Sequence, residues 1–97
     1  MHIIARKPLK QYWEQHPDVE QPLLAWYHDA RRATWTSPAD IKILYRNASI
    51  LANNRVVFNI KGNKYRLVVV VRYSTGKIYV RFIGTHAEYD RIDATTI

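Results

Sequence analysis

The chain has 97 residues, no cysteine and a formal net charge of +7. Its length predicts one domain, residues 1–97, that buries a single core without disulfide bonds or a structural metal. Because no apolar run approaches the length of a membrane span or of a signal-peptide block, we expect a soluble cytoplasmic protein.

The positive charge is unevenly distributed along the sequence. Up to Asp40 there are five basic and five acidic residues, whereas the stretch between Asp40 and Glu88 contains nine basic residues and no acidic one. Neutralising phosphates releases counterions, so an acid-free basic segment favours a polyanionic partner, nucleic acid first. A basic surface that serves only solubility is the alternative.

The first third of the chain predicts a short strand and two helices. Residues 1–5 contain His2-Ile3-Ile4, which suits an edge strand. A helical pattern begins at Arg6, breaks at His16-Pro17-Asp18, and resumes with Asp18 as N-cap to end near Trp35. Each helix carries one apolar stripe, so the pair can cover a sheet. The stripes are Leu9, Tyr12 and Trp13, then Val19, Leu23, Trp26, Tyr27 and Ala30.

Two further segments precede the basic half of the domain. Ser37-Pro38 is an N-cap followed by proline at the first helical position, which predicts a short helix through Leu44. Residues 45–54 are polar and rich in asparagine, so we expect a loop there.

Residues 55–84 predict a three-stranded antiparallel meander. Runs 55–61 and 77–84 alternate apolar and polar residues, and run 64–73 is apolar on both faces in its middle. Gly62-Asn63 fits a two-residue hairpin because both residues tolerate positive φ, and Ser74-Thr75-Gly76 forms the second turn. The predicted fold is α+β, with an N-terminal helical hairpin packed on one face of a small antiparallel β-meander and a short C-terminal helix.

The predicted register determines which side chains share a sheet face. The first turn places Lys61 opposite Lys64 and Asn59 opposite Arg66, whereas apolar matching across the second turn assigns the remaining pairs. These pairs are Arg72 with Lys77, Val68 with Arg81 and Arg66 with Ile83, with Ile78, Val80 and Phe82 on the core side.

In this register, one face of the sheet gathers a polar cluster. Arg66 and Arg81 lie diagonally, about 7 Å apart at the backbone. Like charges so close repel unless an anion lies between them, so the cluster predicts an anion-binding site; a solvated outer sheet face is the alternative. Its members are Asn59, Lys61, Arg66, Tyr79 and Arg81.

The segment after the last strand predicts a helix start that carries proton-transfer groups. Thr85-His86-Ala87-Glu88 fits a capping box, and His86 then lies one turn from Tyr89 and Asp90. Histidine exchanges protons near neutral pH, and tyrosine does so where cations lower its pKa. The alternative is an ordinary terminal helix. The other histidines have no ligand spacing, so we expect no metal site, and no serine or cysteine nucleophile has a visible base.

The element order, the run VFNIKGNKYRLVV, the strand YVRFIG and the ending THAEYD resemble the HigB-type toxins of the RelE superfamily, most specifically over residues 57–90. The resemblance implies a RelE-like fold and the toxin of a type II toxin–antitoxin system, an endoribonuclease that cleaves mRNA without metal or cofactor, typically in the ribosomal A site. The implied partners are mRNA, the ribosome and a helix-turn-helix antitoxin of the HigA type. Operator DNA would be bound only through the antitoxin complex, and no membrane is involved.

The resemblance also implies roles for individual residues. Phosphate binding falls to Lys61, Lys64, Arg66 and Arg81, and proton transfer or substrate orientation falls to His86 and Tyr89; which residue is base and which is acid stays open. We therefore expect Arg66, Arg81, His86 and Tyr89 to be catalytic. The expected RNA-binding residues are Asn59, Lys61, Lys64 and Tyr79.

Two other classes of protein compete with this hypothesis. A non-catalytic RNA-binding module stacks bases on exposed aromatic side chains, and only Tyr79 is placed for that on the charged face. A DNA-binding protein would need a basic recognition helix, and no such motif is evident.

Overall fold

The computed structural model describes residues 1–4 and 6–97. Its elements follow the order strand, three helical segments, a further helix, four strands and a last short helix. They are β1 (His2–Ile4), α1 (Arg6–Gln15), the 3-10 turn η1 (Pro17–Val19), α2 (Glu20–Arg32), α3 (Pro38–Leu44), β2 (Ser49–Ile50), β3 (Arg55–Ile60), β4 (Tyr65–Arg72), β5 (Lys77–Thr85) and α4 (His86–Tyr89).

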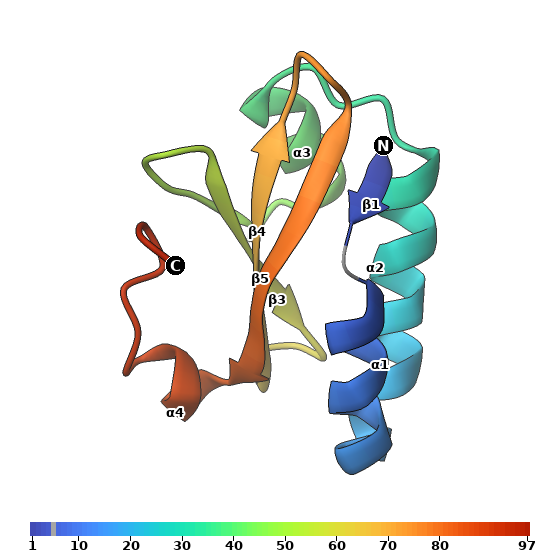
Figure 1. Ribbon diagram of the computed structural model, residues 1–97, viewed down its shortest axis with the longest axis vertical. Helices are drawn as coiled ribbons and strands as arrows, with labels where there is room; N and C mark the ends of the chain where they lie inside the picture. Colours follow the sequence, from blue (N-terminus) through green and yellow to red (C-terminus); the bar gives the residue numbers. More distant parts are fainter. Residues whose placement is uncertain (5) are drawn as a thin grey trace.

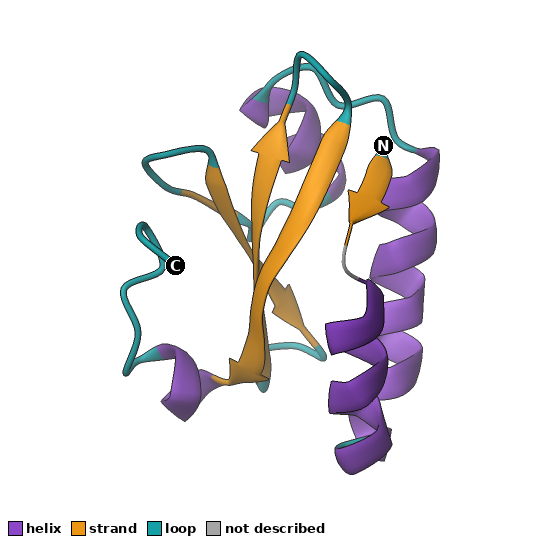
Figure 2. Ribbon diagram, in the orientation of Figure 1, coloured by secondary structure: helices purple, strands orange, loops and turns teal. Residues whose placement is uncertain are grey.

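The strands form one sheet in the order β1-β5-β4-β3-β2 (Figure 2). The predicted α+β class is confirmed, and so is an N-terminal strand over His2–Ile4, but Ala5 lies outside the described residues. The sheet has five strands among the described residues, not three. The segment predicted as a loop contributes β2, and β1 pairs with β5 in parallel, so the sheet is not wholly antiparallel.

Helices α1 and α2 lie side by side along one face of the sheet, which we call the helix face (Figure 1). Their stripes bury Leu9 and Trp13 from α1, and Leu23, Trp26 and Ala30 from α2. Trp26 meets Phe58 of β3 edge-on, with ring centroids 5.4 Å apart. Truncating a buried ring of this size costs about 3–5 kcal/mol, so this contact is central to the stability of the domain.

The break between the two helices differs from the prediction. Asp18 lies within η1 and does not cap α2, whose N-cap residue is Val19 without a side-chain hydrogen bond. Helix α2 also ends at Arg32 rather than near Trp35, and the buried Trp35 stacks on Phe58 instead. The Asp18 carboxylate is thereby free to bond groups outside its own helix.

The opposite face of the sheet, which we call the open face, is covered only in part. After α4 the chain turns back along this face and places the buried Ala94 against Val57 and Val68 (Figure 1). Tyr89 and Ile92 pack beside them. This small second cluster leaves both ends of the open face to polar side chains.

A β-bulge in β5 changes the register from the predicted one. Val69 pairs with Val80, but Val68 pairs with Phe82, so Arg81 is the extra residue. The predicted Arg72–Lys77 pair is confirmed, whereas the predicted Val68–Arg81 and Arg66–Ile83 pairs are wrong.

The bulge also reverses the faces of the next two side chains. A bulge makes two residues of one strand oppose one residue of its partner, so the alternation of side chains shifts by one position beyond it. Phe82, predicted to face the core, packs with the open-face cluster, and Ile83 packs against the main core instead. In the described part of the chain, no helix is long and apolar enough to cross a membrane.

The bulge predicts the relative cost of two matched substitutions. Ile83→Lys places a charge against the main core and should lower the free energy of unfolding by about 2 kcal/mol or more. Phe82→Lys changes a half-buried position on the open face and should cost less. Denaturant unfolding of both variants measures this, and a larger loss for Phe82→Lys would contradict the observed register.

Candidate functional site

Arg66 and Asn59 lie opposite each other at the β3–β4 end of the open face, as predicted. The Arg66 Nη1 donates hydrogen bonds to the carbonyl oxygens of Asn63, at 2.9 Å, and Tyr65, at 3.3 Å. The Asn59 amide donates to the Asn63 side-chain oxygen at 3.5 Å. The turn therefore holds a half-buried guanidinium in a fixed position with further donors free for an anion.

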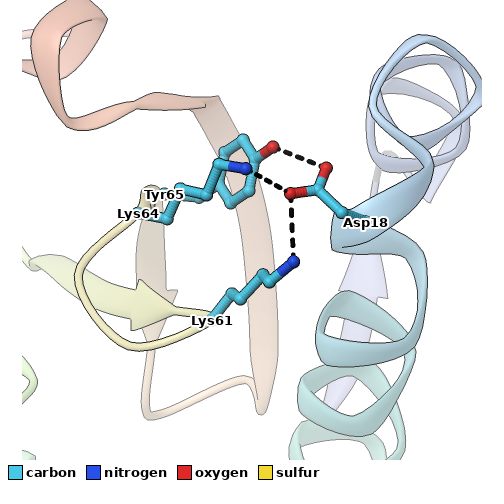
Figure 3. Close-up of polar contacts among 4 residues, drawn as sticks. All are labelled: Asp18, Lys61, Lys64 and Tyr65. Atoms are coloured by element: carbon cyan, nitrogen blue, oxygen red, sulfur yellow. Dashed lines mark hydrogen bonds and ion pairs between the residues drawn. The ribbon is translucent and has the colours of Figure 1, made fainter.

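Lys61 leaves the sheet face on which it was predicted. It has a left-handed φ of 53°, as Gly62 has at 62°, whereas Asn63 does not adopt positive φ. Strand pairing ends at Ile60 and Tyr65, so the turn comprises residues 61–64 rather than two residues. The Lys61 side chain extends toward the helical layer, where its Nζ lies 3.1 Å from the Asp18 carboxylate (Figure 3).

Asp18 binds both lysines of this turn (Figure 3). Its Oδ2 accepts hydrogen bonds from Lys64 at 2.6 Å and from Lys61 at 3.1 Å, and its Oδ1 accepts one from the Tyr65 hydroxyl at 2.7 Å. The Lys64 and Tyr65 hydrogen bonds hold the pKa of Asp18 well below its ordinary value, and the Asp18 carboxylate raises the pKa of Lys64. The two lysines that were predicted to bind RNA thus already form ion pairs with a carboxylate of the protein.

Helix α4 lies at the same end of the sheet as Arg66. The predicted capping box is present: the Thr85 hydroxyl accepts from the Glu88 amide at 3.2 Å, and Glu88 accepts from the Thr85 amide at 2.8 Å. The His86 amide donates to the Lys64 carbonyl at 3.1 Å, which ties α4 to the β3–β4 turn. The His86 Nδ1 lies 3.1 Å from an Asp90 oxygen, and both side chains are exposed. Tyr89 is half-buried against the open-face cluster.

Arg81 and Tyr79 lie elsewhere on the open face. Arg66 pairs with Gly84, so three residues of β5, about 10 Å, separate that pair from Arg81. The predicted diagonal placement of Arg66 and Arg81 is therefore wrong, because the bulge moves Arg81 along the strand. Arg81 and Tyr79 instead line a depression of about 580 Å³, which we call the basic concavity. Its other lining residues are Arg55, Val70, Arg72, Ser74, Thr75 and Lys77.

The sequence did not predict a network that joins Tyr12 of α1 to Glu88 of α4. The Tyr12 hydroxyl donates to Glu88 at 3.3 Å, and the Tyr12 ring stacks on His16 with centroids 4.1 Å apart. Burial and the Glu88 carboxylate raise the pKa of Tyr12 far above its usual range, so this phenol stays protonated. No local motif pairs Tyr12 with Glu88, which are 76 residues apart in sequence, so only the fold could reveal the contact.

The site residues define a small basic α+β domain whose open sheet face suits an anionic ligand. Cations at both ends of this face, a fixed guanidinium at Arg66 and a histidine two residues after the β5 partner of Arg66 suit the binding or cleavage of a phosphodiester. Among the described residues, no group of three histidine or carboxylate side chains is arranged to hold a metal ion.

Comparison with known proteins shows the family. The HigB toxin family, described as the RelE-like toxic component of a toxin–antitoxin system, matches residues 19–92, and the chain belongs to that family. It is 30% identical over 92 residues to the mRNA interferase toxin HigB of Escherichia coli K12, which covers 93% of this chain and 88% of that protein. The mRNA interferase HigB of Shigella flexneri gives the same values. That of Escherichia coli O6:H1 is 23% identical over 94 residues, covering 95% and 91% of the two chains.

The ion pairs of Asp18 predict acid-dependent stability. Because folding lowers the pKa of Asp18, its contribution is complete above the ordinary value of 3.8 and is lost as pH falls below that value. Asp18→Asn should lower the melting temperature by a few degrees at pH 7 and remove part of its decline below pH 4. The matched variant Glu14→Gln, at an exposed position of α1, should do neither. Equal acid profiles for the parent and Asp18→Asn would show that these ion pairs do not stabilise the fold.

Proposed function

We propose that the protein is the toxin of a type II toxin–antitoxin system and an endoribonuclease that cleaves mRNA, on the ribosome and without a metal or cofactor. The observation that carries the proposal is the family match over residues 19–92. It is supported by relatives named mRNA interferase that align with nearly the whole chain. The layered arrangement agrees with the expected RelE-like fold: the helices lie on one sheet face (Figure 1), and Arg66 and the basic concavity lie on the other.

The proposed reaction is attack of the ribose 2′-hydroxyl on the adjacent phosphorus. The 2′-oxygen loses its proton and forms a bond to phosphorus, while the bond to the 5′-oxygen breaks and that oxygen gains a proton. The products are a 2′,3′-cyclic phosphate and a free 5′-hydroxyl. Charge builds up on the non-bridging oxygens during this step, and preorganised donors stabilise it.

Arg66, His86 and Tyr89 are the residues we assign to this step. Arg66 is held by the Asn63 carbonyl and lies opposite Gly84, two residues before His86. Its free donors suit the developing phosphorane charge. His86, paired with Asp90, and Tyr89 supply candidate proton-transfer groups at the same end of the sheet. Arg81 lies three residues of β5 from the Arg66–Gly84 pair and lines the basic concavity, so we assign it, with Asn59, Lys61, Lys64 and Tyr79, to RNA binding.

The proposed partners follow from the same family membership. Membership of a toxin–antitoxin system implies an antitoxin. We propose that this antitoxin is a helix-turn-helix protein of the HigA type, and that operator DNA is bound only through the complex. The ribosome would orient the mRNA, which supplies rate that a sparse set of side chains cannot.

The first test of the proposed function is substitution of Arg66. Induced expression of the parent should arrest growth and create new mRNA 5′ ends, because cleavage frees a 5′-hydroxyl at each cut. Arg66→Ala should reduce cleavage by about 10²-fold or more, since it removes charge stabilisation in the transition state. Stability should stay within about 1 kcal/mol, as for a surface change.

Arg32→Ala is the matched control for this experiment. Its side chain is 80% exposed on α2, in the helical layer on the far side of the sheet, so cleavage should not change. Soluble parent protein that leaves growth and transcript ends unaltered would refute the endoribonuclease and favour an RNA-binding module.

A second test separates proton transfer from RNA binding. Tyr89→Phe keeps the ring that packs on the open-face cluster and removes only the hydroxyl, so RNA binding should persist while cleavage falls. His86→Ala should lower cleavage by about 10²- to 10⁴-fold. Tyr27→Phe, in the helical layer, serves as the control. Parent-level cleavage by both His86→Ala and Tyr89→Phe would remove them from the chemical step.

A further inference from the structure

The basic concavity lies at the opposite end of the open face from Arg66 and His86. Arg66 and Arg72 lie six residues apart on β4, which corresponds to about 20 Å along the strand. Between the two ends lies the apolar cluster of Val57, Val68 and Ala94. The concavity is therefore separate from the site that we assign to the chemical step.

The lining of the concavity is cationic and carries no acid. Its side chains include four cations and three hydroxyl groups in a depression of about 580 Å³. Within residues 1–4 and 6–97, no carboxylate forms an ion pair with Arg72, Lys77 or Arg81, all of which are exposed. This contrasts with Lys61 and Lys64, which both form ion pairs with Asp18.

The cations of the concavity repel one another in the free protein. Arg72 and Lys77 are direct cross-strand partners, and like charges placed directly opposite destabilise a sheet. Arg55 is held in place, because it donates to the Asn53 carbonyl at 3.0 Å and to the main-chain oxygen of Ile97. A bound anion would relieve the repulsion, and the fixed guanidinium limits the ordering that binding requires.

The residues beside the cations fit a nucleic acid strand better than a free phosphate. The row Arg55–Val70–Tyr79 runs across three strands, so an aromatic ring lies next to the charges. Single-stranded nucleic acids are bound by cations that follow the backbone and by aromatic rings on which bases stack. The open face then offers phosphate contacts at both of its ends.

We propose that the basic concavity is a second RNA-binding site, which holds the phosphodiester backbone several nucleotides away from the bond that is cut. The inference rests on the proposed function, because it takes RNA as the ligand. Arg72, Lys77 and Arg81 contact phosphates, and Tyr79 stacks on a base. The RNA is either the substrate strand itself or ribosomal RNA beside it, and both present the same backbone.

The test measures RNA affinity at several salt concentrations for the double variant Arg72→Ala/Lys77→Ala. The probe is a 20-nucleotide single-stranded RNA with 2′-O-methyl groups, which cannot be cut by 2′-hydroxyl attack. Affinity at low salt should fall by about tenfold, and the slope of log K against log salt should become shallower by about 1.4, because two phosphate contacts are lost. The melting temperature should hold or rise, since the variant removes a like-charge pair.

The matched control is Arg31→Ala/Arg32→Ala, which removes the same charge from the exposed end of α2. It should bind RNA like the parent. A second arm repeats the measurement with ribosomes that carry no mRNA. Loss of affinity for the oligonucleotide assigns the site to the substrate strand, and loss for ribosomes alone assigns it to ribosomal RNA; both support the proposal.

Unchanged affinity in both arms overturns the proposal. A variant that binds RNA and ribosomes normally but loses its antitoxin also overturns it, because the concavity would then be a protein-binding surface. Since the probe cannot be cut, the result does not depend on catalysis. A parent protein that binds the probe through the concavity and cleaves no mRNA would refute the proposed activity while leaving this site intact.

Discussion

The packing of Trp26 from α2 against Phe58 of β3 determines which face of the sheet is buried. Once the apolar stripes of α1 and α2 cover the helix face, strand periodicity directs the alternate side chains of β3 and β4 to the opposite face. Those alternate positions include Arg55, Asn59, Arg66 and Arg72. Burial of the apolar side chains on one face therefore determines that the cationic side chains lie on the other face.

The two ends of the open face differ in how their charges are compensated. At the β3–β4 turn, Asp18 forms ion pairs with Lys61 and Lys64 (Figure 3). Because Asp18 lies between α1 and α2, these ion pairs link the helical layer to the turn that holds Arg66. At the β4–β5 turn, Arg72 and Lys77 are cross-strand partners, and no carboxylate among the described residues forms an ion pair with either of them. A strand of RNA that follows the open face would therefore meet a fixed arginine at one end and repelling cations at the other.

The sequence predicted those features that depend on local periodicity. Apolar spacing placed the helices and the three main strands, and the short first turn gave the Asn59–Arg66 pair. The bulge at Arg81 could not be predicted, because alternation in the last strand fits the unbulged register equally well. The parallel pairing of β1 with β5 and the Asp18–Lys64 ion pair also escaped prediction, since they join residues far apart in the chain. The basic character of the site followed from composition, but the separation of Arg81 from Arg66 required the three-dimensional register.

We propose that this domain cuts mRNA by attack of a ribose 2′-hydroxyl at the end of the open face that carries Arg66 and His86. The most direct measurement uses purified protein and ribosomes programmed with an mRNA that has one mapped cleavage position. Replacing the ribose 5′ of that bond with 2′-deoxyribose should abolish cleavage there, and the unmodified mRNA should yield a 2′,3′-cyclic phosphate and a 5′-hydroxyl. Cleavage of the deoxy substrate at the parent rate, or a product with a 5′-phosphate, would rule out attack by the 2′-hydroxyl.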